Sequence, residues 1–204
     1  MTQRQIQRFF RVLARELNRP ARVIVTGAAA GSLWGSLRPS LDIDFAIRLA
    51  RSSRGGQEAL EAAVARTVQL TGIQANYAQD IDRWGQITLL DYHRHTLPYA
   101  RFGALDVRLL DPVYWSIGKI TRYLDPDVQD LQVVLKRRRV PVTPLVRTWG
   151  RALRASPPSP ARAQFRAQAE HFLRACGADV WGRRFDAETA VQQFRRAARV
   201  GHGA

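Results

Sequence analysis

The sequence predicts a mixed α/β fold followed by a helical C-terminal extension. Short apolar runs at 22–26 and 41–48 have the length and composition of buried or half-buried strands. They alternate with segments whose apolar residues recur at helical spacing, an order typical of α/β and α+β domains. We therefore predict a mixed sheet flanked by helices over 1–154, a linker at 155–160 and a basic helical extension over 161–204.

An amphipathic helix is expected first, at 3–17, with Thr2 as its cap. Its apolar face is formed by Ile6, Phe9, Phe10, Leu13 and Leu17. The elements that follow in this half are a strand at 22–26, a small-residue helix at 28–36, a strand at 41–48, a helix at 57–70 and a short strand near 74–78.

The second half is expected to begin with two β-like runs, 86–92 and 99–110, joined by a turn at 93–98. Asp-Pro pairs then open two helices, because Asp caps a helix and Pro tolerates its first turn. These helices are expected at 111–124 and 125–138, and two amphipathic helices at 161–176 and 187–199 follow the linker.

The net charge of +15 is concentrated in the last third of the chain. Residues 1–135 hold 17 basic and 13 acidic side chains, a net charge of +4, and residues 136–204 hold 15 and 4, a net charge of +11. A basic segment of this kind attracts polyanions, with RNA or DNA as the first candidates and a solvated charged surface as the alternative.

The composition also indicates the cellular compartment of the protein. The single cysteine, Cys176, excludes an internal disulfide and is typical of a reducing compartment. The chain has no apolar run long enough to span a membrane and no signal-peptide pattern at Met1. We therefore expect a cytoplasmic protein without a membrane partner.

Two carboxylates mark the candidate site. Strand alternation places Asp42 and Asp44 on one face of their strand, about 7 Å apart. Gly27 ends the preceding apolar strand and begins a small-residue turn that can admit a phosphate. Paired carboxylates beside such a turn suit a divalent metal that carries a nucleotide.

The segment resembles the signature of the nucleotidyltransferase (DNA polymerase β-like) superfamily, in which an apolar residue, Gly, and Gly or Ser precede Asp-apolar-Asp. More narrowly, it resembles the bacterial AbiEii-like toxins and related uncharacterised nucleotidyltransferases. The matching residues are Gly27, Ala28, Trp34, Gly35, Arg38, Ser40 and Asp42-Ile43-Asp44. Ala28 departs from the pattern, which has Gly or Ser at this position. Alanine keeps the backbone amide but lacks the hydroxyl with which a serine could contact a phosphate.

A second match lies downstream, where relatives carry a lysine, an arginine and Asp-x-x-Asp-Leu. Here Lys119 and Arg122 share one helix face, and Asp127 and Asp130 share another. The resemblance implies that Lys119 holds a triphosphate and that Asp127 positions the lysine or a substrate group. The alternative is an interhelical ion-pair network that closes the domain.

Two-metal nucleotidyl transfer usually requires a third carboxylate on a neighbouring strand. Asp91 and Asp106 both qualify by position. Asp91 is preferred because related sequences place an acid before a short hairpin. Asp106 alternates with apolar neighbours and could instead face solvent.

The resemblance implies an enzyme that uses Mg²⁺ or Mn²⁺ at Asp42, Asp44 and Asp91 to move a nucleotidyl group from an NTP to an RNA or protein hydroxyl. Nucleotide contacts would come from Gly27, Ala28, Arg38, Ser40, Lys119, Arg122, Asp127 and Asp130. Such a protein would serve as a toxin or defence component with a cognate antitoxin or regulatory partner. The alternatives are a catalytically weak nucleotide-binding module and an RNA- or DNA-binding protein that uses the basic extension.

Overall fold

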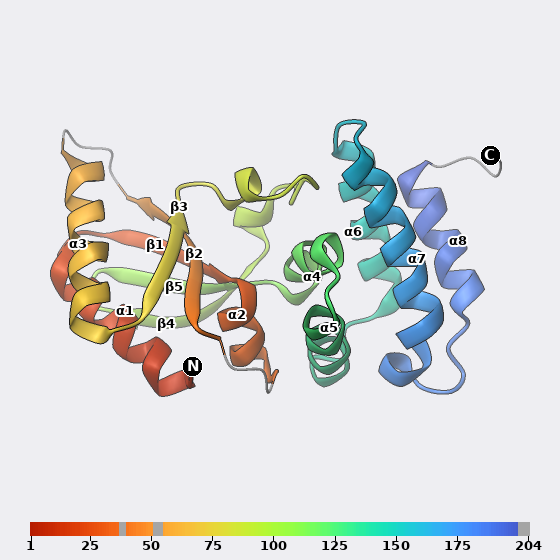
Figure 1. The fold of residues 1–204 in the computed structure, drawn as a ribbon, viewed down its shortest axis with the longest axis horizontal. Helices are drawn as coiled ribbons and strands as arrows, with labels where there is room; N and C mark the ends of the chain where they lie inside the picture. Colours follow the sequence, from red (N-terminus) through yellow and green to blue (C-terminus); the bar gives the residue numbers. More distant parts are fainter. Residues whose placement is uncertain (37–39, 51–54, 200–204) are drawn as a thin grey trace. The chain divides into compact units, whose positions relative to one another are not determined.

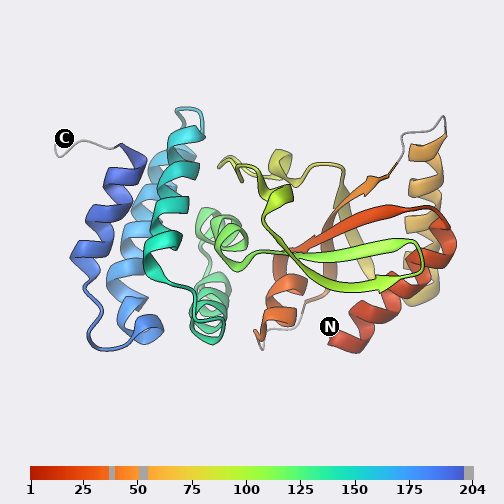
Figure 2. The same ribbon diagram turned by 180° about the vertical axis from the view of Figure 1, so that it is seen from behind.

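The computed structural model describes residues 1–36, 40–50 and 55–199, and the chain divides into two compact units. The described residues form one five-stranded mixed sheet and eight α-helices, which confirms the predicted α/β class (Figures 1 and 2). The first unit comprises Met1–Leu33, Leu37–Ile81 and His93–Leu110, and the second comprises Trp34–Ser36, Asp82–Tyr92 and Asp111–Ala204.

The first unit is built on the sheet, in which the strands follow the order β3-β2-β1-β5-β4. Strand β1 pairs antiparallel with β2 and parallel with β5, while β2 pairs parallel with β3 and β5 antiparallel with β4. The strand bounds are β1 Ala21–Thr26, β2 Asp42–Leu49, β3 Gln74–Ala78, β4 Thr96–Phe102 and β5 Leu105–Leu110.

Helices α1 (Gln3–Leu17) and α3 (Gly56–Thr71) pack against each other, and α1 covers one face of the sheet (Figure 1). The rings of Phe9 and Phe10 meet Phe45 of β2 with centroids 6.0 and 5.7 Å apart. Val23 and Ile43 share this face and are fully buried. The alternate residues of β1 and β2 point to the opposite face, where the charged side chains of the sheet lie.

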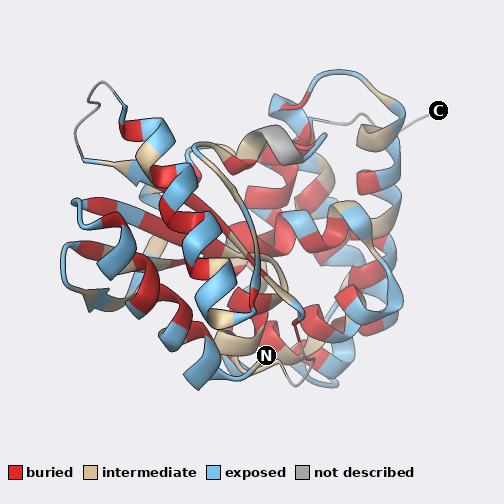
Figure 3. Ribbon diagram, turned by 60° about the vertical axis from the view of Figure 1, so that its left-hand side comes forward, coloured by how far each residue is buried: buried red, intermediate tan, exposed pale blue. Residues whose placement is uncertain are grey.

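The second unit is helical, and its core joins helices that are distant in sequence (Figure 3). Trp149 is fully buried, and its Nε1 donates a hydrogen bond to Ser116 Oγ at 2.8 Å. Gly150 lets α6 and α8 approach closely, because a Cβ there would overlap Ala197. The helix bounds are α4 Pro112–Arg122, α5 Asp125–Arg137, α6 Val142–Ala155, α7 Pro160–Trp181 and α8 Ala187–Ala198.

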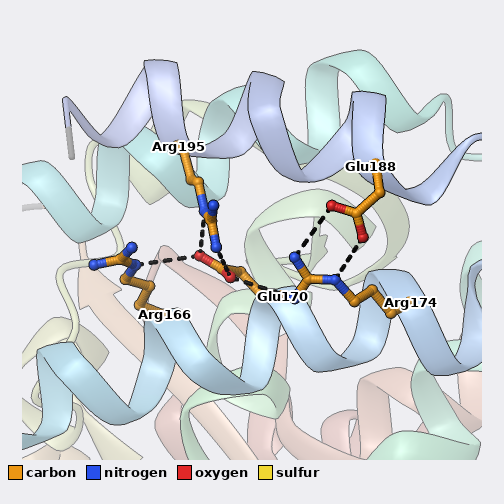
Figure 4. A network of polar contacts seen from close by, with 5 residues as sticks. All are labelled: Arg166, Glu170, Arg174, Glu188 and Arg195. Carbon is orange, nitrogen blue, oxygen red and sulfur yellow. Dashed lines mark hydrogen bonds and ion pairs between the residues drawn. The ribbon is translucent and has the colours of Figure 1, made fainter. Parts of the chain in front are cut away.

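A charged network joins α7 to α8 around the nearly buried Glu170 (Figure 4). Its carboxylate accepts hydrogen bonds from Arg195, at 2.8 and 2.5 Å, and from Arg166 and Arg174 of its own helix. The hydrogen bond from Arg195 outweighs the effect of burial and lowers the pKa of Glu170 to about 2. Glu188 of α8 accepts from Arg174 and extends the network.

The predicted linker joins α6 to α7 inside the second unit. Ser156 is the C-cap of α6, and Ser159 caps the N-terminus of α7 through its side chain. The predicted extension corresponds to α7 and α8, which share this unit with α4–α6. None of the described helices is long and apolar enough to cross a bilayer.

Two strand predictions were wrong. The run 86–92 is irregular, because Asp82 Oδ1 and Ser156 Oγ accept from the backbone amides of Leu89 and Thr88, and Leu90 has a positive φ of 56°. The run 99–110 is divided into the hairpin β4–β5 by Gly103, whose φ is +55°. The predicted turn at 93–98 begins inside the short helix η2 (Tyr92–Arg94) and ends inside β4, which starts at Thr96.

Candidate functional site

Strand β2 places the two predicted carboxylates as the alternation pattern requires. Asp42 and Asp44 are half-buried on one face, whereas Ile43 and Phe45 are fully buried on the other. The side chains of the two aspartates therefore point away from the α1-covered face of the first unit.

Asn76 lies beside this pair and contacts both of its members. It sits on β3, directly opposite Asp44 in the parallel register. Its Nδ2 donates to Asp42 Oδ2 at 2.9 Å and to Asp44 Oδ1 at 3.0 Å. One exposed amide thus bridges two carboxylates that would otherwise repel each other. Asn76 was not predicted as a site residue, although the short strand that carries it was predicted near 74–78.

Gly27 also belongs to this site. It is the first residue of helix α2 (Gly27–Trp34), which follows β1 without a loop, and its φ is +62°. A Cβ at this position would overlap the carboxylate of Asp44. Glycine is therefore required both for the backbone conformation and for the approach of Asp44 to the helix N-terminus, where the helix dipole favours negative charge.

The remaining residues of the resemblance are placed differently. Ala28 is half-buried in the first turn of α2. Ser40 is buried, and its Oγ donates to the carbonyl of Asp42 at 2.6 Å, so its hydroxyl fixes the start of β2. Trp34 and Gly35 belong to the second unit, and Arg38 lies outside the described residues.

The sheet register separates Asp106 from the carboxylate pair. Asp106 is opposite Arg22 on β1, whereas Asp44 is opposite Thr26. Four residues along a strand correspond to roughly 13 Å. Asp106 instead forms an ion pair with Arg22 at 3.1 Å. The structure therefore does not bring Asp106 to the pair.

Asp91, the preferred third carboxylate, belongs to the second unit, where it is exposed directly before η2. Within residues 1–36, 40–50 and 55–199, no group of three or more His, Cys, Asp or Glu side chains is placed to hold a metal ion. The local oxygen donors around Asp42 and Asp44 are thus two carboxylates and the amide of Asn76.

The second predicted cluster is a buried ion-pair network between α4 and α5. Lys119 Nζ donates to Asp127 Oδ1 at 3.0 Å and to Asp130 Oδ2 at 2.6 Å. The lysine side chain is 4% exposed, and the two aspartates are 0% and 1% exposed. Arg122 adds hydrogen bonds to Asp127 at 2.6 and 2.5 Å, and Ser36 Oγ donates to Asp130 at 2.5 Å.

The two cations of this network, Lys119 and Arg122, compensate the charges of the two buried carboxylates. Burial would raise the pKa of Asp127, but the hydrogen bonds from Arg122 and Lys119 outweigh it and lower the pKa. The Lys119 ammonium also lies 5.3 Å from the ring centroid of Trp115. These contacts are those of the interhelical alternative, and the phosphate-binding role of Lys119 stays a prediction.

Exposed basic residues gather at one end of the second unit. Lys136–Arg139 end α5, and Trp181 Nε1 donates to the carbonyl of Val140 at 2.8 Å. This bond holds the α7–α8 turn, with Arg183 and Arg184, beside the end of α5. We call Lys136–Arg139 together with Arg183 and Arg184 the basic end.

Comparison of the chain with family models, with curated proteins and with solved structures found no match.

Proposed function

We propose that the first unit is a nucleotidyltransferase-type domain that binds a magnesium nucleotide and transfers its nucleotidyl group to a hydroxyl acceptor. The observation that carries this proposal is the arrangement of Asp42 and Asp44 under the amide of Asn76, directly beside the glycine turn that opens α2. The AbiEii-like resemblance of the same segment supports it.

The donor set fits one magnesium ion. Asp42 and Asp44 supply two carboxylates with a combined charge of −2, and rotation of the Asn76 amide would present its Oδ1 in place of Nδ2. Carboxylate and amide oxygens are the ligands that hard cations prefer. Two carboxylates neutralise one divalent cation, so this chain favours a site with one metal ion.

A magnesium ion bound there would neutralise phosphate charge and polarise the α-phosphorus toward attack. The chain's own residues would position the nucleotide. Gly27 begins α2, and the N-terminus of a helix favours an anion, as in known phosphate sites. Ser40 would act indirectly, by fixing the start of the strand that carries the aspartates.

Label transfer tests the proposal. The full chain is incubated with Mg²⁺, labelled NTPs and total RNA or protein, and transferred label is measured. We expect transfer by the wild type and its loss in Asp42→Asn/Asp44→Asn. Asp179→Asn is the control, because this aspartate is exposed on α7 in the second unit and belongs to neither the carboxylate pair nor its surroundings. Equal transfer by wild type and the double variant would refute the enzymatic role.

A nucleotide-binding module without turnover is the second candidate, and Asn76 is the observation that favours it. An amide stands where a third carboxylate would complete a two-metal set, which weakens the electrostatic part of catalysis. Calorimetry with Mg·ATP separates the two functions, since heat of binding without label transfer indicates the module.

The acceptor that we propose is an RNA end, and the basic end of the second unit supports this choice. Six exposed cations within one short region give a salt-dependent attraction to a phosphate backbone. Arg139→Gln/Arg184→Gln should weaken RNA binding and flatten its salt dependence, whereas Arg4→Gln should not. RNA binding by the wild type without any label transfer, retained in Asp42→Asn/Asp44→Asn, would indicate a nucleic-acid-binding protein.

A further inference from the structure

A row of charged side chains crosses the sheet of the first unit at the end remote from the carboxylate pair. Arg48 of β2 is opposite Arg22 of β1, Arg22 is opposite Asp106 of β5, and Asp106 is opposite Arg101 of β4. Directly opposed residues project from the same face of a sheet. We call these four residues the arginine row, and it lies on the face that α1 does not cover.

The row carries more positive charge than it can balance. Three guanidinium groups share one carboxylate, to which Arg22 Nε donates at 3.1 Å. Arg48 Nε donates to the carbonyl of Gln79 at 3.1 Å, which leaves its charge uncompensated. The terminal Nη atoms of Arg22 and Arg48, and the whole Arg101 guanidinium, make no further hydrogen bond or ion pair with any residue that the structure describes.

This arrangement weakens the sheet unless an anion binds. Like charges directly opposite on paired strands are destabilising, and the Arg22–Arg48 pair is of this kind. Structures retain such unfavourable contacts mainly at functional sites, where the strain is part of the mechanism. A ligand with two negative charges would neutralise the net charge of the row.

The row borders a cavity of about 410 Å³. Its lining includes all four residues of the row, and an apolar floor is formed by Ile24, Ala46 and Leu49. His93 also reaches the cavity. A concave site with an apolar floor and a few convergent charged groups has the make-up of a small-molecule site, and this volume lies within the usual range.

We propose that this cavity binds an organic phosphate of nucleotide size, with its phosphate on the three arginines and its body on the apolar floor. Guanidinium groups are the preferred partners of phosphate, because their donors match its oxygens in pairs. The site is distinct from the carboxylate pair, since Arg22 and Arg48 lie four strand residues, roughly 13 Å, from Thr26 and Asp44. It needs no metal and does not depend on the proposed transferase function.

Calorimetry with AMP in EDTA tests the site on the full chain. We expect AMP to bind, adenosine to bind much more weakly, and rising salt to weaken AMP binding. Arg48→Gln and Arg101→Gln should each weaken AMP binding by roughly tenfold, the effect of losing one charge-assisted hydrogen bond. Arg4→Gln, at an exposed arginine of α1, should bind AMP like the wild type.

Thermal unfolding gives a second measurement that does not depend on affinity alone. Arg48→Thr should unfold at the same temperature as the wild type or higher, because it removes the cross-strand repulsion. AMP should raise the unfolding temperature of the wild type and of Asp42→Asn/Asp44→Asn, and it should raise that of Arg48→Thr by less at the same AMP concentration. Equal AMP responses in wild type and Arg48→Thr, or equal binding of AMP and adenosine, would overturn the proposal.

Discussion

Replacement of Lys119 by methionine would show how far the buried network stabilises the second unit. The substitution removes two charge-assisted hydrogen bonds, of 3.0 and 2.6 Å, and keeps an apolar chain beside Trp115. Asp127 would retain Arg122 and Asp130 would retain the hydroxyl of Ser36, but both carboxylates would lose the buried ammonium group.

The magnitude follows from burial. Breaking a buried ion pair by removing one partner costs about 3–5 kcal/mol, because the other charge is left uncompensated in the interior. A carboxyl group can escape this state by taking up a proton, which at neutral pH costs about 4 kcal/mol. We therefore expect Lys119→Met to lower the free energy of unfolding by about 3–4 kcal/mol at pH 7, and by less at lower pH.

Urea unfolding followed by tryptophan fluorescence measures this effect. All five tryptophans belong to the second unit, so their emission reports on that unit. Lys136→Met is the matched control, because Lys136 is the other lysine of the chain and is exposed at the end of α5. A loss below about 1 kcal/mol in Lys119→Met, the range of an exposed ion pair, would refute the argument.

Three further substitutions test other parts of the structure. The pKa of Glu170 is lowered from 4.5 to about 2, so its contribution to stability is complete above pH 4.5 and declines as pH falls toward 2. The shift corresponds to about 3 kcal/mol, which is reduced because the partner arginines are 30–42% exposed. We therefore expect Glu170→Gln to lower the free energy of unfolding, measured in urea, by about 2 kcal/mol at pH 7 and by about half as much at pH 3. Gly27→Ala should speed amide hydrogen exchange in β1 and β2, because a Cβ at Gly27 would overlap the carboxylate of Asp44. Gly72→Ala is the control, since Gly72 also has a positive φ but no atom lies within 4 Å of its Cβ position, and it should speed exchange less in its own helix. Equal effects would contradict the contact between Gly27 and Asp44. Asn76→Asp adds a third carboxylate to the pair, so it should lower the unfolding temperature in EDTA and increase the stabilisation by Mg²⁺; an unchanged Mg²⁺ response would show that Asn76 does not face the ion.

Local patterns were sufficient for the elements that bound the carboxylate site. The apolar face of α1 and its cap at Thr2 follow from helical spacing, and Thr2 forms a capping box with Gln5. The alternation of β2 likewise determines which face carries Asp42 and Asp44. Each of these predictions depends on residues close together in the chain, for which periodicity is a direct physical signal.

Predictions failed where side chains replaced the expected backbone partners. The run at 86–92 has buried Ile87 and Leu89, as a strand would, but the amide of Leu89 donates to Asp82 instead of to a neighbouring strand.

Helix α6 was not predicted. Val142 and Pro144 at its start have low helix propensity, although Leu145, Trp149 and Leu153 recur at helical spacing.

The chemistry of both sites depends on register, which the sequence does not encode locally. Asn76 faces Asp44 only because β3 pairs parallel with β2, and Arg22 faces Arg48 only because β1 pairs antiparallel with it. A shift of one residue in either pairing would send these side chains to the α1-covered face. The pairing of the strands therefore determines which side chains Asn76 and Arg22 face, and neither strand's own sequence predicts this. The amide of Asn76 is the clearest case, since it changes the expected metal site from three carboxylates to two carboxylates and one neutral oxygen donor.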